Sequence, residues 1–130
     1  MDDWVRITEE DVRAELKKSF PKVRRSEVYL EMIQRAKEAL GNRQHVIYDG
    51  CNLTVTERTA VLKQIKEDYG KTVSYYIVYM DTDKDLCIKR NNLRLPKVLT
   101  DSIINDAVFL EPPTYAEGWD LIKTIHTITD

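Results

Sequence analysis

Three groups of charged or amide side chains follow short apolar stretches of the sequence. Open parallel sheets bind their ligands beyond the carboxyl ends of the strands. The groups follow residues 4–7, 46–48 and 72–80, which have the composition of buried strands. They consist of Glu10, Asp11 and Arg13, of Asp49, Asn52 and Arg58, and of Arg90 and Arg94. We therefore expect these groups on the ligand-binding side of one sheet.

These residue types suit the transfer of a phosphoryl group. A carboxylate can accept the proton of an attacking hydroxyl, while arginines bind phosphate oxygens through paired hydrogen bonds. Arg90 and Arg94 are four residues apart, which would place them on one face of a helix. Two simpler interpretations remain open: the two arginines only pair in solvent with carboxylates of the same helix, and Asp49 and Asn52 are only turn residues.

Periodicity and capping residues predict strands that alternate with helices. Thr8, Ser26 and either Thr54 or Thr56 are placed to cap helices at their start, and glycines at 41 and 70 to end them. Residues 72–80 carry no charge, which predicts a strand buried on both faces. We expect strands at 4–7, 44–48, 72–80 and 121–128, and helices at 8–20, 26–40, 54–69, 81–94 and 100–111. This order predicts one α/β domain, a parallel sheet covered by helices.

Composition narrows the class of protein. The 130 residues, 42% hydrophobic and 32% charged, have a normal length and balance for one globular domain. With 20 Lys and Arg against 22 Asp and Glu, the net charge is -2, so contact with nucleic acid would need a local patch. Two cysteines outside any C-x-x-C pair and two histidines without metal-ligand spacing predict no metal site and a reducing, cytoplasmic location. No apolar run is long enough to span a membrane, so we expect no membrane partner.

Four short motifs give the sequence a resemblance to a known family. They are Arg-Ile-Thr-Glu-Glu-Asp-Val-Arg from residue 6, Val-Ile-Tyr-Asp-Gly-Cys-Asn-Leu from residue 46, Cys-Ile-Lys-Arg-Asn-Asn-Leu-Arg from residue 87, and Phe-Leu-Glu-Pro-Pro-Thr-Tyr-Ala-Glu-Gly-Trp from residue 109. In this order and spacing they resemble the polynucleotide kinase type of P-loop kinase, over nearly all of the chain. The resemblance implies a parallel sheet of strand order 2-3-1-4-5. It also implies transfer of the ATP γ-phosphate to a 5′-hydroxyl of a nucleic acid or to a small hydroxylated acceptor.

The resemblance also implies roles for individual residues. Glu10 takes the place of the carboxylate that accepts the hydroxyl proton. Arg13 takes the place of the arginine that binds the acceptor phosphate. Asp49 and Asn52 match an Asp-x-Thr-Asn element, while Arg94 matches the lid arginine that reaches the ATP phosphates. The expected catalytic residues are Glu10, Arg13, Asp49 and Arg94, the ATP contacts are Arg90, Asn91 and Arg94, and the substrate contacts are Arg13, Asn52 and Arg58. ATP and Mg²⁺ are the implied cofactors.

The sequence departs from the family pattern at three points. Glu10 replaces an Asp that is one methylene shorter, and Cys51 replaces a Thr and so removes a hydroxyl donor. No Gly-x-x-x-x-Gly-Lys-[Ser/Thr] occurs, so this sequence lacks the backbone cradle for phosphate, its Lys and the hydroxyl that binds Mg²⁺. The family carries that loop on the central strand. Without that strand, two sheet edges keep unpaired backbone N–H and C=O groups. Each such group that is buried costs about 1 to 3 kcal/mol of stability.

Three hypotheses suit residues 1–130 as one P-loop kinase-like domain that is N-terminally incomplete relative to the family. The chain is an inactive part of a longer kinase, or a noncatalytic protein that binds a nucleotide, a nucleic acid or a partner, or it receives the missing strand from a second copy or another chain. Positioning and electrostatics supply most of the catalysis in phosphoryl transfer, so we expect little activity from the chain alone. Any nucleic-acid affinity, through Arg13, Arg24, Arg25, Arg90 and Arg94, would depend strongly on salt.

Overall fold

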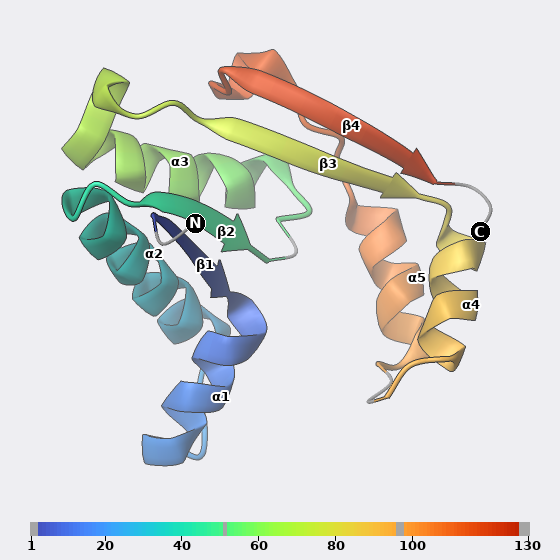
Figure 1. Cartoon of the computed structure of the whole chain (residues 1–130). Coiled ribbons are helices and arrows are strands. Elements are labelled where there is room, and N and C mark those ends of the chain that lie inside the picture. Colours follow the sequence, from blue (N-terminus) through green and yellow to red (C-terminus); the bar gives the residue numbers. More distant parts are fainter. Residues whose placement is uncertain (1–2, 51, 96–97, 128–130) are drawn as a thin grey trace. The chain divides into compact units, whose positions relative to one another are not determined.

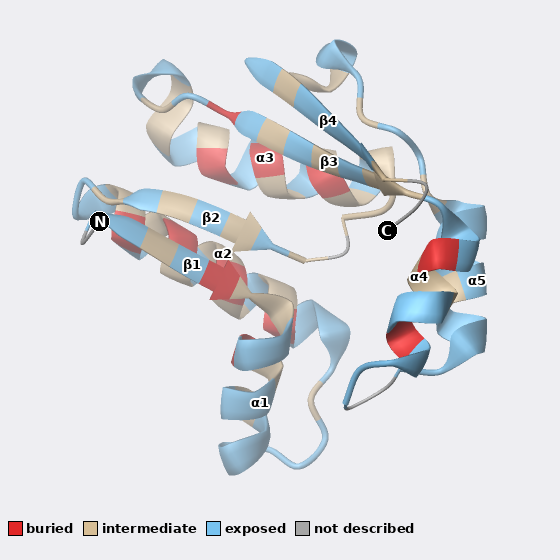
Figure 2. Ribbon diagram, turned by 45° about the vertical axis from the view of Figure 1, so that its right-hand side comes forward, coloured by how far each residue is buried: buried red, intermediate tan, exposed pale blue. Residues whose placement is uncertain are grey.

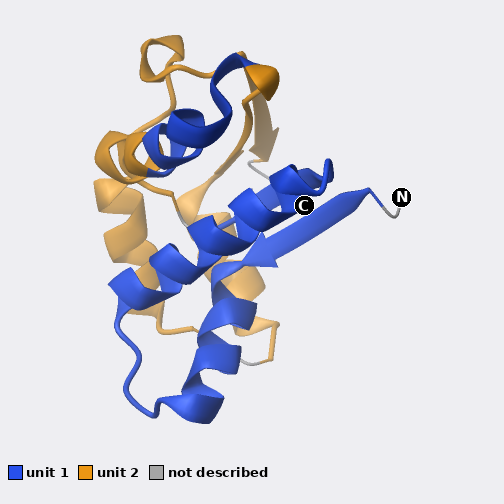
Figure 3. Ribbon diagram, turned by 90° about the vertical axis from the view of Figure 1, so that its left-hand side faces the viewer, with its two compact units in different colours: residues 1–51, 61–71 blue, residues 52–60, 72–130 orange. Residues whose placement is uncertain are grey.

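The computed structural model describes residues 3–50, 52–95 and 98–127 and divides the chain into two units. Residues 1–51 and 61–71 form unit 1, and residues 52–60 and 72–130 form unit 2 (Figure 3). Helix α3 (Val55–Tyr69) contributes its first residues to unit 2 and the remainder to unit 1. Each unit contains one pair of strands.

Unit 1 is built on β1 (Trp4–Thr8) and β2 (His45–Asp49), which pair in parallel. The register runs from Trp4 opposite His45 to Thr8 opposite Asp49. Two helices, α1 (Glu9–Ser19) and α2 (Arg25–Gly41), connect the two strands (Figure 1). These elements confirm the predicted strands at 4–7 and 44–48 and the two helices between them, to within one or two residues.

The core of unit 1 depends on one side of α2. Val28, Met32 and Ala36 recur every four residues and are buried, as is Ala39 (Figure 2). This side of α2 packs on β1, β2 and α1. Full burial of a side chain the size of Met32 contributes about 1.5 to 3 kcal/mol. These four side chains therefore form the buried face of α2.

Capping residues set the start of the first two helices. The Thr8 hydroxyl oxygen accepts a hydrogen bond of 3.0 Å from the Asp11 N–H, which confirms Thr8 as the cap of α1. The prediction of a Ser26 cap is wrong. Helix α2 begins one residue earlier, at Arg25, and the preceding Arg24 makes no side-chain capping bond.

Gly41 ends α2 where the helix closely approaches α3. A Cβ atom at Gly41 would lie 3.2 Å from the Tyr69 hydroxyl oxygen, and that hydroxyl donates a hydrogen bond of 2.6 Å to the Lys37 carbonyl. The left-handed turn after the helix falls on Arg43, with φ of 60°. Gly41 therefore stands at the predicted end of the helix because of close packing, not because of its backbone freedom.

Unit 2 is built on β3 (Tyr76–Thr82) and β4 (Leu121–Thr127), which also pair in parallel. Between them lie α4 (Lys84–Asn92), α5 (Thr100–Phe109) and the 3₁₀ turn η2 (Tyr115–Glu117). β3 starts four residues later than predicted. Thr72 belongs to a 3₁₀ turn, η1 (Gly70–Thr72), that Gly70 opens at φ of 50°, and residues 73–75 connect this turn to the strand. β4 confirms the last predicted strand, except for residue 128, which lies outside the described residues.

Helix α4 is shorter than predicted. An Asp83 carboxylate oxygen accepts hydrogen bonds from the N–H groups of Asp85, at 3.1 Å, and Leu86, at 3.3 Å, so Asp83 caps the start of the helix. The helix ends at Asn92, and Arg94 lies in the turn beyond it. The prediction that Arg90 and Arg94 share one helical face is therefore wrong.

One face of the β3–β4 pair is exposed. Tyr76, Val78 and Met80 of β3 are between 55% and 65% exposed. Leu121 and Ile125 stand beside Tyr76 and Met80 in the register and are exposed as well. The prediction of a strand buried on both faces is therefore wrong. The physical reason is that the pair is only two strands wide and no described residue of unit 2 covers this face.

The α/β class and the parallel pairing are confirmed, with five α-helices and four strands among the described residues. The strands form two separate pairs, however, and not one continuous sheet. Within the part of the chain that the structure describes, each strand pairs with one neighbour, so each retains one open edge.

Candidate functional site

The carboxyl ends of β1 and β2 bring three predicted site residues to one edge of unit 1. Thr8 and Asp49 lie opposite one another in the register, and α1 begins immediately after Thr8. In Figure 1, α1 begins at the carboxyl end of β1. Glu10 and Arg13 lie in the first turns of α1 and so follow the strand end that stands opposite Asp49. Glu10 is exposed to solvent. This edge combines accessible carboxylates with a guanidinium group, which are the groups that hydroxyl activation and phosphate binding use.

Asp49 has an arginine partner that sequence position did not reveal. Arg6 of β1 donates a hydrogen bond of 2.6 Å to an Asp49 carboxylate oxygen, and both side chains remain partly exposed. This hydrogen bond and the charge of Asp49 raise the pKa of Arg6. Arg6 lies opposite Ile47, two residues before Asp49, so Arg6 and Asp49 share one face of the sheet. The parallel register is the signal that would have identified this pair.

Arg13 contacts the carboxylate one helical turn before it. Arg13 Nη2 donates to Glu9 Oε1 at 2.8 Å, and Arg25 Nε lies 3.5 Å from the same oxygen. The Glu9 side chain is only 12% exposed. The guanidinium carbon of Arg25 lies 5.1 Å from the centroid of the Tyr29 ring. Two of the arginines expected to contact phosphate thus meet at one carboxylate in unit 1.

Arg58 is buried within unit 2. Its Nε and Nη2 atoms donate to the two carboxylate oxygens of Glu117, at 2.8 and 3.1 Å, and both side chains are 2% exposed. Its Nη1 atom donates to the carbonyls of Asn52 and Leu53, each at 3.0 Å. Arg58 therefore fixes the segment that precedes α3, and its geometry gives no support to the interpretation as a substrate contact.

The Glu117 carboxylate is surrounded by hydrogen-bond donors. Besides Arg58, the Thr114 N–H donates to it at 2.8 Å and the Trp119 indole N–H at 3.2 Å. The hydrogen bonds from Arg58 lower the pKa of Glu117 to about 2; burial opposes this shift, and the bonds from Thr114 and Trp119 add to it. Glu117 and Trp119, in the Glu-Gly-Trp end of the fourth motif, therefore stabilise the fold of unit 2 through these hydrogen bonds.

The two amide residues of the predicted site are also held by backbone contacts. Asn52 adopts φ of 46°, a left-handed conformation that asparagine tolerates better than most residues, and Arg58 binds its carbonyl. The buried Asn91 side chain donates to the Val98 carbonyl at 2.7 Å and accepts from the Val98 N–H at 3.0 Å. Asn91 therefore joins the end of α4 to the segment before α5. The Cys51 position lies outside the described residues.

Arg90 and Arg94 are exposed in unit 2. The other predicted catalytic residues, Glu10, Arg13 and Asp49, belong to unit 1. The structure therefore places Glu10, Arg13 and Asp49 in one unit. The residues expected to contact ATP lie in the other unit, as do two of the three expected substrate contacts, Asn52 and Arg58.

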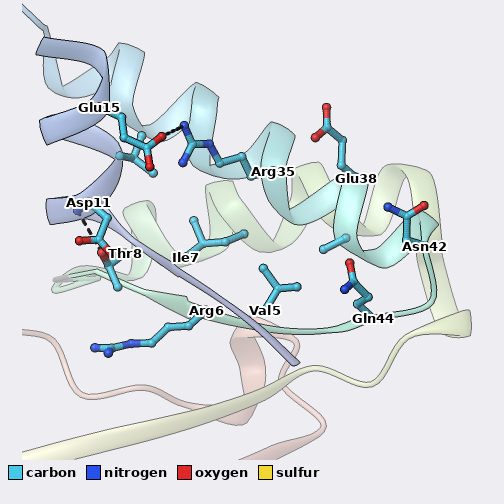
Figure 4. Close-up of a pocket in the computed structure, with 12 residues that line it drawn as sticks. Val5, Arg6, Ile7, Thr8, Asp11, Glu15, Arg35, Glu38, Asn42 and Gln44 are labelled. Carbon is cyan, nitrogen blue, oxygen red and sulfur yellow. Dashed lines mark hydrogen bonds and ion pairs between the residues drawn. The ribbon is translucent and has the colours of Figure 1, made fainter. Parts of the chain in front are cut away.

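A pocket of about 330 Å³ opens in unit 1, lined by residues of β1, α1 and α2 (Figure 4). Ile7 and Val12 contribute apolar surface to it, and Glu15 and Arg35 form an ion pair of 2.6 Å in its wall. The hydrogen bonds that Arg35 donates to Glu15 and Glu31 raise the pKa of Arg35. Asp11 of the first predicted group lines this pocket, as do Arg6 and Thr8 of β1, so the pocket adjoins the edge described above, although Glu10, Arg13 and Asp49 do not line it.

Among residues 3–50, 52–95 and 98–127, no group of His, Cys, Asp and Glu side chains could hold a metal ion. None of the described helices combines the length and the apolar composition that crossing a membrane requires. Comparison of the sequence with protein-family models and with curated proteins gives no match.

Proposed function

We propose that this chain is a polynucleotide kinase-type scaffold that supplies the acceptor-binding and lid residues of a phosphoryl transfer reaction. ATP with Mg²⁺ is the donor, and a 5′-hydroxyl of a nucleic acid is the acceptor. Unit 1 carries the acceptor residues Glu10, Arg13 and Asp49, while unit 2 carries Arg90 and Arg94, assigned to ATP. The phosphate-binding strand and loop come from another polypeptide segment. A cytoplasmic location, where ATP is present, belongs to the same proposal.

The pairing of the strands is the observation that carries this proposal. Removal of the central strand from the order 2-3-1-4-5 leaves two parallel pairs, 2-3 and 4-5. β1 and β2 form one parallel pair and β3 and β4 form the other, with no ladder between β2 and β3 in the described part of the chain. Both the pairing and the chain order of the strands support a sheet from which one central strand is missing.

The charges on the strands support the same arrangement. β1 carries Arg6 and β4 carries Lys123, each near the middle of its strand, whereas β2 and β3 contain no Lys, Arg or Pro. Natural sheets commonly protect open edges with charged residues, especially Lys, or with Pro. This distribution suits β1 and β4 as outer strands, and β2 and β3 as strands that pair on both sides.

The chemistry assigns one task to each group. Glu10 accepts the proton of the attacking hydroxyl, Arg13 binds the acceptor phosphate, and Arg94 stabilises the charge on the transferred phosphoryl group. These groups alone cannot hold the γ-phosphate in line with the hydroxyl, because the backbone N–H cradle and its Lys are missing. Positioning supplies most of the catalysis in this reaction class, so the chain alone is expected to transfer no phosphate.

A fusion experiment tests the proposal. A strand–loop–helix segment containing Gly-x-x-x-x-Gly-Lys-Ser is joined ahead of Asp3 through a flexible linker. Transfer of radiolabel from ATP to an oligonucleotide with a free 5′-hydroxyl is then measured. We expect labelled product from the fusion, none from the chain alone, and none from the fusion carrying Glu10→Gln or an Ala in place of the loop Lys.

Two outcomes would contradict the proposal. The first is a fusion that unfolds in one cooperative transition, and is therefore folded, but neither binds ATP nor forms product. The second is labelled product from the chain alone, because the proposal holds that the chain lacks the phosphate cradle on which the reaction depends.

A further inference from the structure

The lateral edge of β1 that does not pair with β2 lies in the wall of the unit 1 pocket. Four consecutive residues of β1, residues 5–8, line this pocket of about 330 Å³. Successive side chains of a strand point to opposite faces, so the main chain that joins them also faces the pocket. Figure 4 shows Val5 and Ile7 on one side of β1 and Arg6 on the other. The pocket is therefore a groove along the backbone of an edge strand, with α1 and α2 in its walls.

The hydrogen bonds between β1 and β2 determine which backbone groups face this groove. The His45 N–H donates to the Asp3 carbonyl. Along a paired strand, residues whose N–H and C=O groups bond to the neighbour alternate with residues whose groups point away from it. The backbone of Asp3 and Val5 thus turns toward β2, and that of Arg6 turns outward. Arg6 offers the groove one donor and one acceptor that no described residue of unit 1 binds.

The Arg6 side chain leaves this edge open. Its guanidinium group is hydrogen-bonded to Asp49 of β2 at 2.6 Å, so its charge is compensated on the side of the paired strand. The same charge opposes the addition of β1 from a second copy, because an in-register pair would bring two Arg6 side chains together. The edge therefore disfavours its own copy and accepts a strand of different composition.

The walls of the groove favour a cation. Glu15 of α1 is paired with Arg35 of α2 at 2.6 Å, so these two charges cancel. Asp11 of α1 and Glu38 of α2 also line the groove, and neither forms an ion pair with the described residues. Glu38 lies in the last turn of α2, at the negative end of the helix dipole, and this turn contains no basic residue. A positively charged group is therefore the complement that these walls lack.

We propose that this groove binds an extended, basic segment of a partner protein as a strand added to β1. The main chain of the segment pairs with the N–H and C=O groups of Arg6, and its Lys or Arg side chains reach Asp11 and Glu38. Its apolar side chains contact the surface that Ile7 and Val12 contribute. In strand addition the main chain supplies affinity and the side-chain pockets supply specificity. The inference does not rest on the proposed function, because β1 keeps this outer edge whether or not a central strand pairs with β2.

Fluorescence anisotropy with a labelled peptide tests the charge of the groove. The probe is acetyl-Thr-Lys-Val-Lys-Val-Lys-Thr with a fluorophore at its carboxyl end, titrated with the whole chain. The double variant Asp11→Asn, Glu38→Gln is expected to bind about tenfold more weakly, because it loses two exposed charge contacts. Glu27→Gln removes an exposed carboxylate of α2 outside the groove and is the matched control, expected to bind like the wild type.

Variants of Arg6 test the pairing of the main chains. Arg6→Pro removes the outward N–H but no hydrogen bond to β2, and edge strands tolerate proline in this orientation. Arg6→Ala keeps the N–H and loses the same ion pair with Asp49, so it is the matched control. We expect Arg6→Ala to bind at least as tightly as the wild type, and Arg6→Pro to bind about tenfold more weakly than Arg6→Ala. Circular dichroism establishes that both variants are folded.

Modified peptides make the same test from the side of the ligand, even if Arg6→Pro does not fold. Two probes carry N-methyl groups at every second residue, one in each phase, so that each has one blocked edge and an unchanged charge. At least one of them should lose binding about tenfold, because a strand pairs with β1 through one edge. Lysine amide should displace the parent probe only at much higher concentration.

Several results would overturn the inference. They are no saturable binding of the probe, a double variant that binds like the wild type, and a folded Arg6→Pro that binds like Arg6→Ala. Two methylated probes that bind like the parent would show association by charge alone, and equal competition by lysine amide would show a pocket for a small amine. None of these assays needs ATP or a phosphate-binding loop, so their failure leaves the transfer result of the fusion protein standing, and the reverse also holds.

Discussion

Arg58 and Glu117 join the start of α3 to the segment before β4 within unit 2. Their side chains share two hydrogen bonds and are almost completely excluded from solvent. Thr114 and Trp119 donate further hydrogen bonds to the carboxylate, so its charge is well compensated. A buried pair of this kind is costly to break, because removal of one partner leaves an unpaired charge in the interior.

The stability of unit 2 is expected to depend on pH through Glu117. Its pKa of about 2 in the folded protein lies below the ordinary value of 4.5. The contribution of the ionised carboxylate is therefore complete above about pH 4.5 and is lost as the pH falls toward 2. Urea denaturation in steps from about pH 6 to about pH 3 should show a smaller loss of unfolding free energy in Glu117→Gln than in the wild type.

Glu67→Gln, at an exposed position of α3, is the matched control for this prediction. It should lose stability on acidification as the wild type does. Parallel pH profiles of the wild type and Glu117→Gln would show that the carboxylate contributes nothing ionic to the fold, contrary to this account.

The candidate site was predictable where it depends on sequence order, and not where it depends on register or burial. Glu10, Arg13 and Asp49 follow directly from strands that end at Thr8 and Asp49, so their common edge could be expected. Arg6 reaches Asp49 only because of the register between β1 and β2. Arg58 could not be recognised as buried, because its partner Glu117 is 59 residues away in the sequence.

At the scale of elements, some helix ends depend on neighbouring capping residues, and others depend on contacts between residues that are far apart in the sequence. Thr8 and Asp83 act as local caps, and both could be predicted from the residues that follow them. The place of Gly41, in contrast, depends on the Tyr69 hydroxyl of α3. Local propensity therefore predicted which elements form better than where they end.

The contact between Gly41 and Tyr69 predicts that Gly41→Ala changes the unfolding free energy in opposite directions in the wild type and in a Tyr69→Phe variant. In the wild type, Gly41→Ala should lower the unfolding free energy, because the new methyl group crowds a hydroxyl that is held by the Lys37 carbonyl. In a Tyr69→Phe background, which itself loses about 0.5 to 1.5 kcal/mol with the hydrogen bond, the same change should stabilise the helix by up to about 1 kcal/mol. Thermal and urea denaturation of the four proteins measure both effects.

An equal effect of Gly41→Ala in the two backgrounds would contradict this explanation. It would mean that the hydroxyl gives way without cost, and that glycine at this position has another reason.

At the scale of the whole molecule, the open edges of β2 and β3 are the feature that needs a partner. Neither strand carries a protecting cation, and the face of β3 that bears Tyr76, Val78 and Met80 is apolar and exposed. A strand edge without Lys, Arg or Pro beside an apolar face favours pairing with further strands. The sequence predicted that two strand edges would lack their neighbour, but not that the strands would separate into two sheets.

The β3 edge is expected to make the chain self-associate as its concentration rises. Met80→Lys places a charge on that strand and should reduce the association seen by sedimentation velocity. Ile125→Lys places the same charge at the register partner of Met80 on β4, which already carries Lys123, and should have a smaller effect. Equal effects of the two changes, or a wild type that stays monomeric throughout, would contradict an exposed pairing edge on β3.

The central claim is that an added strand pairs with β2 on one side and with β3 on the other. Hydrogen–deuterium exchange, measured by mass spectrometry on the chain and on the fusion protein, tests it most directly, because a new ladder protects the amides of both edges. We predict that exchange in His45–Asp49 and Tyr76–Thr82 slows in the fusion by more than exchange in Trp4–Thr8 and Leu121–Thr127. Slowing confined to Trp4–Thr8 or Leu121–Thr127, or no slowing in either β2 or β3, would contradict it.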